Sequence, residues 1–324
     1  MRLLLQFPEG LKRYATEEAA KYEKEGHEVF ISATPCWGAC DLALDEAKKI
    51  KADKLVHYGH AQYHQVKDFD VEYKLFPITV DLSVFDQALP LLAPYRRIAL
   101  VTTVSHIHQL PDMRKILEKV GHEVLTSKGG LAILEGQVLG CDSSAADKLS
   151  GQADAIVYFG GGEFHPLGIG SFGGGAKSGS PAPLKPTLAV SPYARSAYWL
   201  NPHIEKKRKQ ERGMLIAASQ AQRVGILVSL KSGQYNLRTA EATKKRLESY
   251  GRTASILVTG EVDFHAVQDF NAFDAYVTTA CPRLVDDAER LGKPVVNVAQ
   301  LPELFSLIED TAGEAPKAAA AKTR

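Results

Sequence analysis

The sequence contains four cysteines, which could bind a metal or a cluster, form disulfides or be buried as small apolar residues: Cys36, Cys40, Cys141 and Cys281. Cysteine thiolates are the usual ligands of iron–sulfur clusters, with four thiolates to a cluster. A set of three would leave one iron with an open position for a substrate or a cofactor. The cysteines do not have the short CxxC spacing of a ferredoxin, and free cysteines are often small buried residues, so spacing alone leaves both roles open.

Zinc binding and disulfide bonding are two further uses of cysteine. Zinc sites usually contain paired Cys or His at short spacing, and Cys36 and Cys40 form one such pair without a second pair nearby. Met1–Gly10 (MRLLLQFPEG) is too short for the core of a signal peptide and resembles a buried strand. We therefore expect a reducing, cytoplasmic location, where disulfides are rare. No apolar run approaches the ~20 residues of a membrane span, so no membrane partner is expected.

The elements that must position the cysteines recur three times along the chain, which indicates duplication. Each repeat has an apolar strand, a helix that stops at a glycine, and three further strands. Apolar strands that alternate with helices predict parallel sheets covered on both faces, and glycine suits the left-handed helix end. We expect first strands at Arg2–Pro8, Arg97–Val104 and Val224–Lys231. The helices that follow are expected at Ala15–Glu25, Met113–Val120 and Thr239–Tyr250, ending at Gly26, Gly121 and Gly251. We expect second strands at 27–33, 122–127 and 252–259, third strands at 52–59, 153–160 and 273–280, and fourth strands at 73–80, 185–192 and 293–300.

The predicted fold is therefore α/β, with three pseudo-repeated, Rossmann-like domains arranged around a common centre. We place repeat domain 1 at 1–92, repeat domain 2 at 93–214 and repeat domain 3 at 215–310, followed by a flexible tail at 311–324. Two segments lie outside the repeat. A Gly, Ser and Pro-rich segment at 160–186 is expected to be a long mobile loop, and 202–212 a basic helix.

Each predicted domain places a cysteine where ligands gather in open α/β sheets, at the carboxyl ends of the strands. Cys40 follows the second strand of domain 1, in TPCWGACD. Cys141 lies at a strand end of domain 2, in GQVLGCD, and Cys281 follows the third strand of domain 3, in VTTACPRL. Three pseudo-equivalent edges can face one centre, so position favours a shared iron–sulfur cluster over a buried apolar role.

At these residues the sequence resembles a known family. TPCWGACDLA, LVHYGH, GQVLGCD, SLKSGQYNL and TTACPRL together are similar to 2-(3-amino-3-carboxypropyl)histidine synthase of the archaeal, homodimeric type, the first enzyme of diphthamide biosynthesis. The resemblance extends from Arg2 to about Phe305. It implies a [4Fe–4S] cluster held by Cys40, Cys141 and Cys281, with S-adenosylmethionine at the open iron.

The resemblance also implies a reaction and its partners. Reductive cleavage of S-adenosylmethionine would give a 3-amino-3-carboxypropyl radical, which adds to the imidazole C2 of one histidine in elongation factor 2 and leaves methylthioadenosine. The expected partners are elongation factor 2, a second copy of the chain and an unidentified electron donor. The ordinary CxxxCxxC motif of radical S-adenosylmethionine enzymes is absent from the sequence. A net charge of +1 argues against bulk nucleic-acid binding.

Two positions near the first ligand need comment. Cys36 lies four residues before Cys40 and is an alternative ligand. The family motif centres on the cysteine of the Gly-Ala-Cys triplet, which is Cys40, and the position of Cys36 is not always cysteine in the family. Trp37 stands where tyrosine is commoner.

Two further segments are candidates for contact with the cofactor or the substrate. The first follows the third strand of domain 1, and the alternative is a solvated strand end. The second is a glycine loop before a helix, whose backbone N–H groups suit the carboxylate of S-adenosylmethionine, and the alternative is an ordinary strand–helix turn. The candidates are His57, Tyr58, Gly59 and His60 in the first segment and Lys231, Ser232, Gly233 and Gln234 in the second.

Three other functions remain open at this point. Quinolinate synthase also combines three α/β repeats with a three-cysteine cluster, although its motifs match less closely. A noncatalytic partner subunit would keep the fold, but the cysteine retained in each repeat argues against it. A sugar- or nucleotide-binding protein without a cluster is the remaining alternative.

Overall fold

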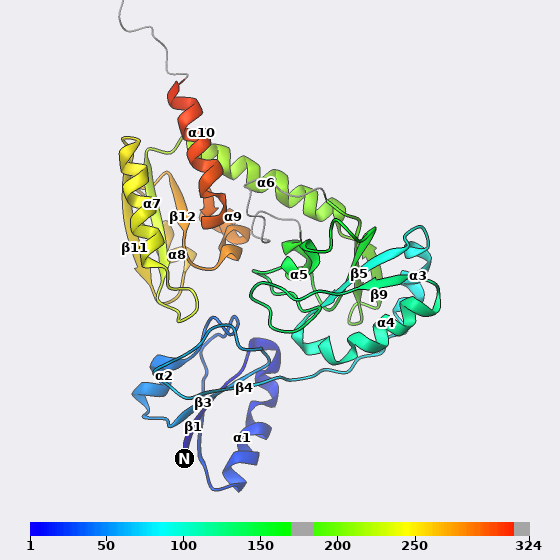
Figure 1. Ribbon diagram of the computed structural model, residues 1–324. Helices are drawn as coiled ribbons and strands as arrows, with labels where there is room; N and C mark the ends of the chain where they lie inside the picture. The colour runs from blue at the N-terminus through cyan, green and yellow to red at the C-terminus, as the bar shows by residue number, and fades with distance from the viewer. Residues whose placement is uncertain (170–183, 314–324) are drawn as a thin grey trace, which may run out of the picture. The chain divides into compact units, whose positions relative to one another are not determined.

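The computed structural model describes residues 1–169 and 184–313 (Figure 1). These residues form two compact units by their internal contacts. The first unit contains the described residues up to 205 together with Lys231–Gln234, and the second contains 206–230 and 235–313. Among the described residues, no helix combines the length and the apolar character that a membrane span requires.

The first sheet is built from the N-terminal part of the chain. Its elements are β1 (Arg2–Gln6), η1 (Glu9–Tyr14), α1 (Ala15–Lys24), β2 (Glu28–Ile31), α2 (Leu44–Lys49), β3 (Lys54–Tyr58) and β4 (Val71–Lys74). All its strand pairs are parallel, in the order β2-β1-β3-β4. Successive side chains of a strand point to opposite faces. Leu3 and Leu5 accordingly pack with α1, and Leu4 packs with α2 on the other face.

The fourth strand of this sheet differs from its predicted position. We expected it at 73–80, whereas β4 ends at Lys74. Pro77 has no N–H to donate to a neighbouring strand. By Ile78 the chain has left the sheet, because its N–H donates to Ser105 O at 2.9 Å. The apolar residues of 75–80 therefore lead to the second sheet instead of extending the first.

The second sheet repeats this arrangement and adds one strand. Its elements are α3 (Phe85–Leu92), β5 (Arg97–Thr102), η2 (Val104–Gln109), α4 (Leu110–Lys119), β6 (Glu123–Leu125), α5 (Ser144–Asp147), β7 (Ala155–Phe159), η3 (Pro166–Gly168), β8 (Thr187–Ser191), β9 (Ser196–Trp199) and the start of α6 (Asn201–Ser219). The order is β6-β5-β7-β8-β9, in which β9 is antiparallel to β8. Our sequence reasoning missed β9, which returns through a turn at Arg195, a residue with φ of +48°.

The third sheet forms the core of the second unit. Its elements are β10 (Arg223–Ser229), α7 (Leu237–Ser249), β11 (Thr253–Thr259), α8 (Phe264–Gln268), β12 (Ala275–Thr278), η4 (Pro282–Asp287), α9 (Ala288–Leu291), β13 (Val295–Asn297), η5 (Val298–Gln300) and α10 (Leu301–Gly313). The parallel order β11-β10-β12-β13 matches the first sheet. Residues of α7 and α10 cover one face, and residues of α8 and η4 cover the other.

The predicted α/β class with three parallel sheets is therefore confirmed. Gly26, Gly121 and Gly251 stand two residues after the last residues of α1, α4 and α7, with φ values of +84°, +96° and +73°. Glycine adopts this left-handed conformation at little cost, so these three helix ends match the prediction. The basic helix expected at 202–212 is part of α6. The domain boundaries near 93 and 215 stay predictions. The flexible tail predicted at 311–324 begins too early, because 311–313 are the last residues of α10. Residues 314–324 of that tail and residues 170–183 of the proposed loop lie outside the described residues.

Each sheet has a fully buried apolar centre. Leu5, Ile98 and Ile226 lie in the central strands of the three sheets, and each is 0% exposed. Full burial of such a side chain contributes about 1.5–3 kcal/mol. These rigid centres hold the strand ends, from which the cysteine-bearing loops begin.

Candidate metal centre

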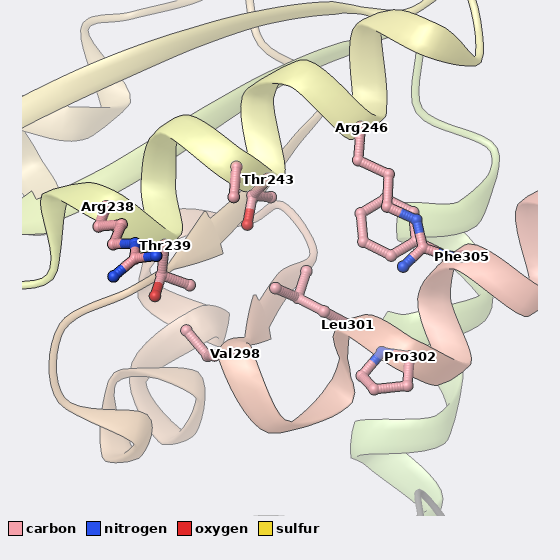
Figure 2. Close-up of a pocket in the computed structure, with 9 residues that line it drawn as sticks. Arg238, Thr239, Thr243, Arg246, Val298, Leu301, Pro302 and Phe305 are labelled. Carbon is pink, nitrogen blue, oxygen red and sulfur yellow. The ribbon is translucent and has the colours of Figure 1, made fainter.

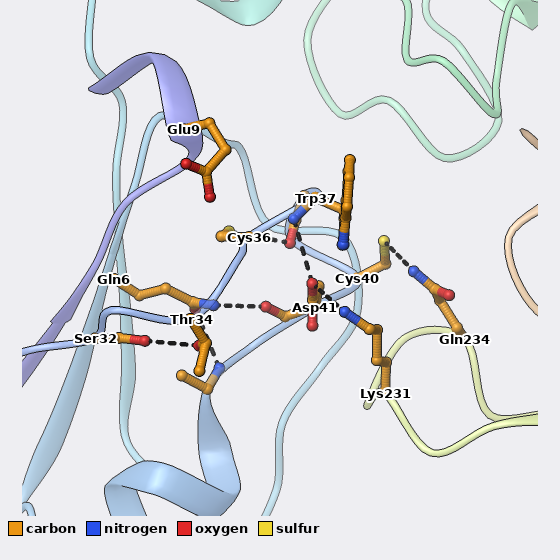
Figure 3. A network of polar contacts seen from close by, with 12 residues as sticks. Gln6, Glu9, Ser32, Thr34, Cys36, Trp37, Cys40, Asp41, Lys231 and Gln234 are labelled. Atoms are coloured by element: carbon orange, nitrogen blue, oxygen red, sulfur yellow. Dashed lines mark hydrogen bonds and ion pairs between the residues drawn. The ribbon is translucent and has the colours of Figure 1, made fainter. Parts of the chain in front are cut away.

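The loop that carries Cys40 is fastened to the end of β1. Gln6, the last residue of β1, is 1% exposed. Its side-chain Nε2 donates to Asp41 O at 2.7 Å, and its Oε1 accepts from Ala43 N at 3.1 Å (Figure 3). Because these bonds use both ends of one buried amide, they determine the path of the backbone directly after Cys40.

Residues Lys231–Gln234 hold the same loop from another side. Lys231 Nζ lies 2.6 Å from Asp41 Oδ2, and both side chains are nearly buried. Gln234 Nε2 donates to Cys40 Sγ at 3.4 Å, as Figure 3 shows. The backbone N–H of Gly233 donates to Cys40 O at 2.9 Å. A Cβ atom on Gly233 would lie 2.6 Å from Cys40 Cα, so this close approach requires glycine.

The two cysteines of this loop have different surroundings. Burial raises the pKa of the Cys40 thiol, but the amide of Gln234 acts against this by donating to the sulfur. Burial, followed by the carboxylate of Asp41, raises the pKa of Cys36 to about 12. The Cys36 Sγ faces a carbonyl, Gly38 O, at 3.9 Å. An N–H donor stabilises a thiolate and a carbonyl does not, so the surroundings favour Cys40 over Cys36 as a cluster ligand.

The loop that carries Cys141 is held by residues close to it in sequence. Leu139 and Asp142 exchange two backbone hydrogen bonds, of 2.8 and 3.3 Å, around the cysteine. The Asp142 carboxylate accepts from Leu131 N at 2.6 Å and from Ala132 N at 3.1 Å. It also accepts from the backbone N–H of Ser144 at 3.0 Å. These bonds hold the backbone around Cys141, four residues after Gln137, which forms a parallel bridge with Thr102 at the end of β5.

The pKa of the Asp142 carboxyl reflects the same contacts. Burial acts to raise the pKa of this carboxyl, but hydrogen bonds from Ser144, Leu131 and Ala132 outweigh it and lower the pKa below its usual value. The carboxylate is therefore ionised in the folded protein at neutral pH. It serves as a charged anchor for the backbone on both sides of Cys141.

Cys281 lies directly beyond the end of β12. Thr279 donates from both its backbone N and its Oγ1 to Leu227 O, each at 3.0 Å. Cys281 O then accepts from Leu284 N at 3.1 Å, at the start of η4. Like Cys40 and Cys141, Cys281 is half-buried. Cys281 therefore lies three residues beyond a strand end, close to its predicted place, whereas Cys40 and Cys141 lie in longer loops, nine residues after β2 and sixteen residues after β6. The shared ligand role of the three cysteines stays a prediction.

The other predicted segment, His57–His60, divides into two kinds of residue. The Tyr58 ring stacks on Phe7 with 4.3 Å between centroids, and its hydroxyl donates to Glu18 at 3.0 Å, so Tyr58 belongs to the core. Gly59 turns the chain with φ of +78°. Burial lowers the pKa of His57 to about 3, with a further lowering from His60, and burial lowers the pKa of His60 to about 4. Both imidazoles are therefore neutral at neutral pH. Contact of these residues with a cofactor stays a prediction.

A separate hollow of about 390 Å³ lies in the second unit, between α7 and the start of α10 (Figure 2). Arg238, Thr239 and Thr243 line one side, and Leu301 and Phe305 line the other. It contains none of the predicted site residues, and nothing in the sequence pointed to it. The Arg246 guanidinium there stacks on the Phe305 ring at 4.0 Å.

Comparisons with known proteins agree with the resemblance. The family model for diphthamide synthesis proteins matches residues 7–314. The 2-(3-amino-3-carboxypropyl)histidine synthase of Pyrococcus horikoshii is 35% identical over 315 residues, which cover 95% of this chain and 87% of that protein. Subunit 1 of the same synthase from Caenorhabditis elegans is 28% identical, over 90% of this chain and 72% of that protein.

Solved structures show the same relationship. A crystal structure of Dph2 from Pyrococcus horikoshii matches with a TM-score of 0.82 at 32% identity, over 94% of this chain and 86% of that one. A second crystal structure, of the same protein with a 4Fe–4S cluster, matches with a TM-score of 0.81. Since the family model and the archaeal relative both cover nearly the whole sequence, this chain belongs to the diphthamide synthesis protein family.

Proposed function

We propose that this protein is an iron–sulfur transferase that moves the 3-amino-3-carboxypropyl group of S-adenosylmethionine to the imidazole C2 of a histidine in elongation factor 2. One observation carries the proposal. The chain matches, over 94% of its length, a structure that contains a 4Fe–4S cluster, and each of its three sheets has a half-buried cysteine in a connection that follows one of its strands.

The residues present suit such a cluster. Cys40, Cys141 and Cys281 would hold it, because thiolates are its usual ligands and three of them leave one iron open. When bound, the cluster would supply the reducing electron and an iron site for S-adenosylmethionine. Gln234 would orient the Cys40 sulfur through its N–H···S hydrogen bond. The Lys231–Asp41 ion pair would keep the Cys40 loop in place.

The proposed reaction neither gains nor loses electrons overall, because the electron that starts it is returned at the end. One electron enters S-adenosylmethionine, the bond between its sulfur and the aminocarboxypropyl carbon breaks, and methylthioadenosine leaves. The carbon radical then forms a bond with C2 of the histidine, and the adduct loses one electron and the C2 proton. Which carbon–sulfur bond breaks depends on how the substrate is positioned. The predicted glycine loop, Lys231–Gln234, and the predicted segment His57–His60 are the candidates for that positioning.

Product analysis tests this function. The full chain is reconstituted and reduced with dithionite without oxygen, and the nucleoside product is separated by chromatography. We expect methylthioadenosine, and with elongation factor 2 present we expect one histidine to gain an aminocarboxypropyl group. A target factor that lacks this histidine is the control. A product dominated by 5′-deoxyadenosine, or formation of quinolinate from its precursors, would contradict the proposal.

The proposal includes the partners expected from the family. A second copy of the chain is one, and an electron donor of unidentified nature is another. Light scattering at micromolar concentration tests the first, because a homodimer has twice the mass of the 35.3 kDa chain. A fully active monomer would contradict it.

A further inference from the structure

A second group of metal-binding side chains lies behind the Cys40 loop. The ligand atoms of Cys36, His57 and His60 all lie within 4.8 Å of one another. Cys36 is 4% exposed and His57 is 0% exposed. Cys36 comes from the loop after β2, His57 from β3 and His60 from the turn after β3. Three donors from three places in the chain therefore meet at one buried point.

The orientation of His57 is determined by a neighbouring amide. Gln6 Nε2 donates to Asp41 O, so the atom of Gln6 that faces His57 is the carbonyl Oε1. His57 Nδ1 lies 2.8 Å from this oxygen and must donate to it. The neutral ring then carries its proton on Nδ1, and the lone pair of Nε2 points toward His60 Nδ1, 3.0 Å away. A carbonyl acceptor on the outer ring nitrogen is the usual partner of a metal-binding histidine.

We propose that Cys36, His57 and His60 bind one zinc ion, separate from the cluster proposed for Cys40, Cys141 and Cys281. A thiolate with two imidazoles is a preferred donor set for zinc, and tetrahedral bonds of about 2.0–2.3 Å hold such donors about 3.3–3.8 Å apart, so the three donors would adjust their separations on binding. Three protein ligands leave a fourth position for water. The zinc ion would tie the loop that carries Cys40 to β3, and would give His57 and His60 a role other than cofactor contact.

Binding changes the protons of the site in a defined way. Without the ion, His60 Nδ1 donates to His57 Nε2, and the Cys36 thiol faces Gly38 O. On binding, the His60 proton moves to its other ring nitrogen, and the thiol proton is released to solvent. One proton therefore leaves for each zinc ion bound. The alternative is a neutral pair of hydrogen-bonded histidines without an ion, which predicts no zinc and no proton release.

Metal analysis of the full chain decides between these alternatives. Iron and zinc are measured by mass spectrometry in anaerobically purified protein. We expect about one zinc per chain in the unsubstituted protein. We expect at least a tenfold loss of zinc in Cys36→Ser and in His60→Gln, with iron unchanged in Cys36→Ser. His64→Gln, the same change at a nearby histidine outside the group, is the matched control and should keep its zinc. Equal zinc in Cys36→Ser and the unsubstituted chain, or none in either, would overturn the proposal.

A second measurement isolates the sulfur ligand. In a Cys40→Ala/Cys141→Ala/Cys281→Ala variant, Cys36 is the one remaining cysteine of the chain. We expect Co²⁺ to give a thiolate-to-cobalt absorption band in this variant and to lose it when Cys36 is also replaced by alanine. A folded variant without the band would contradict the proposal. If the variant does not fold, the zinc content of Cys36→Ser decides the question alone, and failure of the transfer reaction would not affect either result.

Discussion

The loops around Cys40 and Cys141 both hold a half-buried cysteine, but they do so in different ways. Asp142 anchors the second loop through residues two to eleven positions away. The first loop depends on Lys231 and Gln234, which are 190 and 194 positions away from their partners. The Cys141 loop is therefore held by neighbours in sequence and by Thr102 of β5, whereas the Cys40 loop is also held by a part of the chain 190 or more positions away.

Removing the Lys231 charge should show the difference between the Cys40 loop and the Cys141 loop most clearly. In Lys231→Met, Asp41 keeps a nearly buried charge without its partner, which typically costs about 3–5 kcal/mol. We expect a large loss of stability together with loss of iron, because the Cys40 loop loses its anchor. Thermal unfolding and iron content measure these effects. The double variant Asp41→Asn/Lys231→Met should recover part of the stability, and no recovery would argue against a direct pairing.

Two glycine substitutions test the same difference between the loops with a smaller expected loss of stability. A Cβ on Gly233 meets backbone atoms of Cys40, whereas a Cβ on Gly140 meets the side-chain ring of Phe164, which is 52% exposed. Gly233→Ala should cost about 1–3 kcal/mol, the usual range for overpacking. Gly140→Ala is the matched control and should cost less. Denaturant titrations of both variants test this, and the reverse order would contradict the comparison.

Acid should act on the Cys141 loop through Asp142. The folded protein lowers the pKa of this carboxyl below its ordinary value of 3.8. Its contribution to stability is therefore present above that value and is lost as the pH falls through the folded pKa. We expect the amides around residues 131–144 to lose protection in acid, measured relative to the intrinsic exchange rate at the same pH, and a weaker acid dependence of this protection in Asp142→Asn. An unchanged acid dependence in this variant would show that other groups control the effect.

The smallest change concerns the hydrogen bond to the Cys40 sulfur. Gln234→Leu removes the N–H donor while keeping a side chain of similar size. Donors to cluster sulfurs stabilise the reduced state, so the proposed cluster should have a more negative reduction potential in this variant. A redox titration followed by electron paramagnetic resonance measures the change. Iron content should stay normal, and an unchanged potential would mean that the 3.4 Å contact does not reach the bound sulfur.

The sequence was sufficient for the parts of the fold that local patterns determine. Apolar strands and the helix-ending glycines at Gly26, Gly121 and Gly251 predicted three parallel sheets. The end of β4 and the presence of β9 depend on where the chain turns after Pro77 and at Arg195, and strand patterns do not encode these turns strongly. The position of Cys281 just beyond β12 was predictable for the same local reason, whereas the longer loops that carry Cys40 and Cys141 were not. The contact of Lys231 and Gln234 with the Cys40 loop was not, because pairs so far apart in sequence leave no local signal.

The iron content of four single-cysteine variants tests the central claim most directly. The chain and each Cys→Ala variant are reconstituted without oxygen and analysed for iron, sulfide and the electron paramagnetic resonance signal. We predict that Cys40→Ala, Cys141→Ala and Cys281→Ala each lose the cluster, while Cys36→Ala keeps it. A normal cluster in Cys40→Ala together with its full loss in Cys36→Ala would contradict the account.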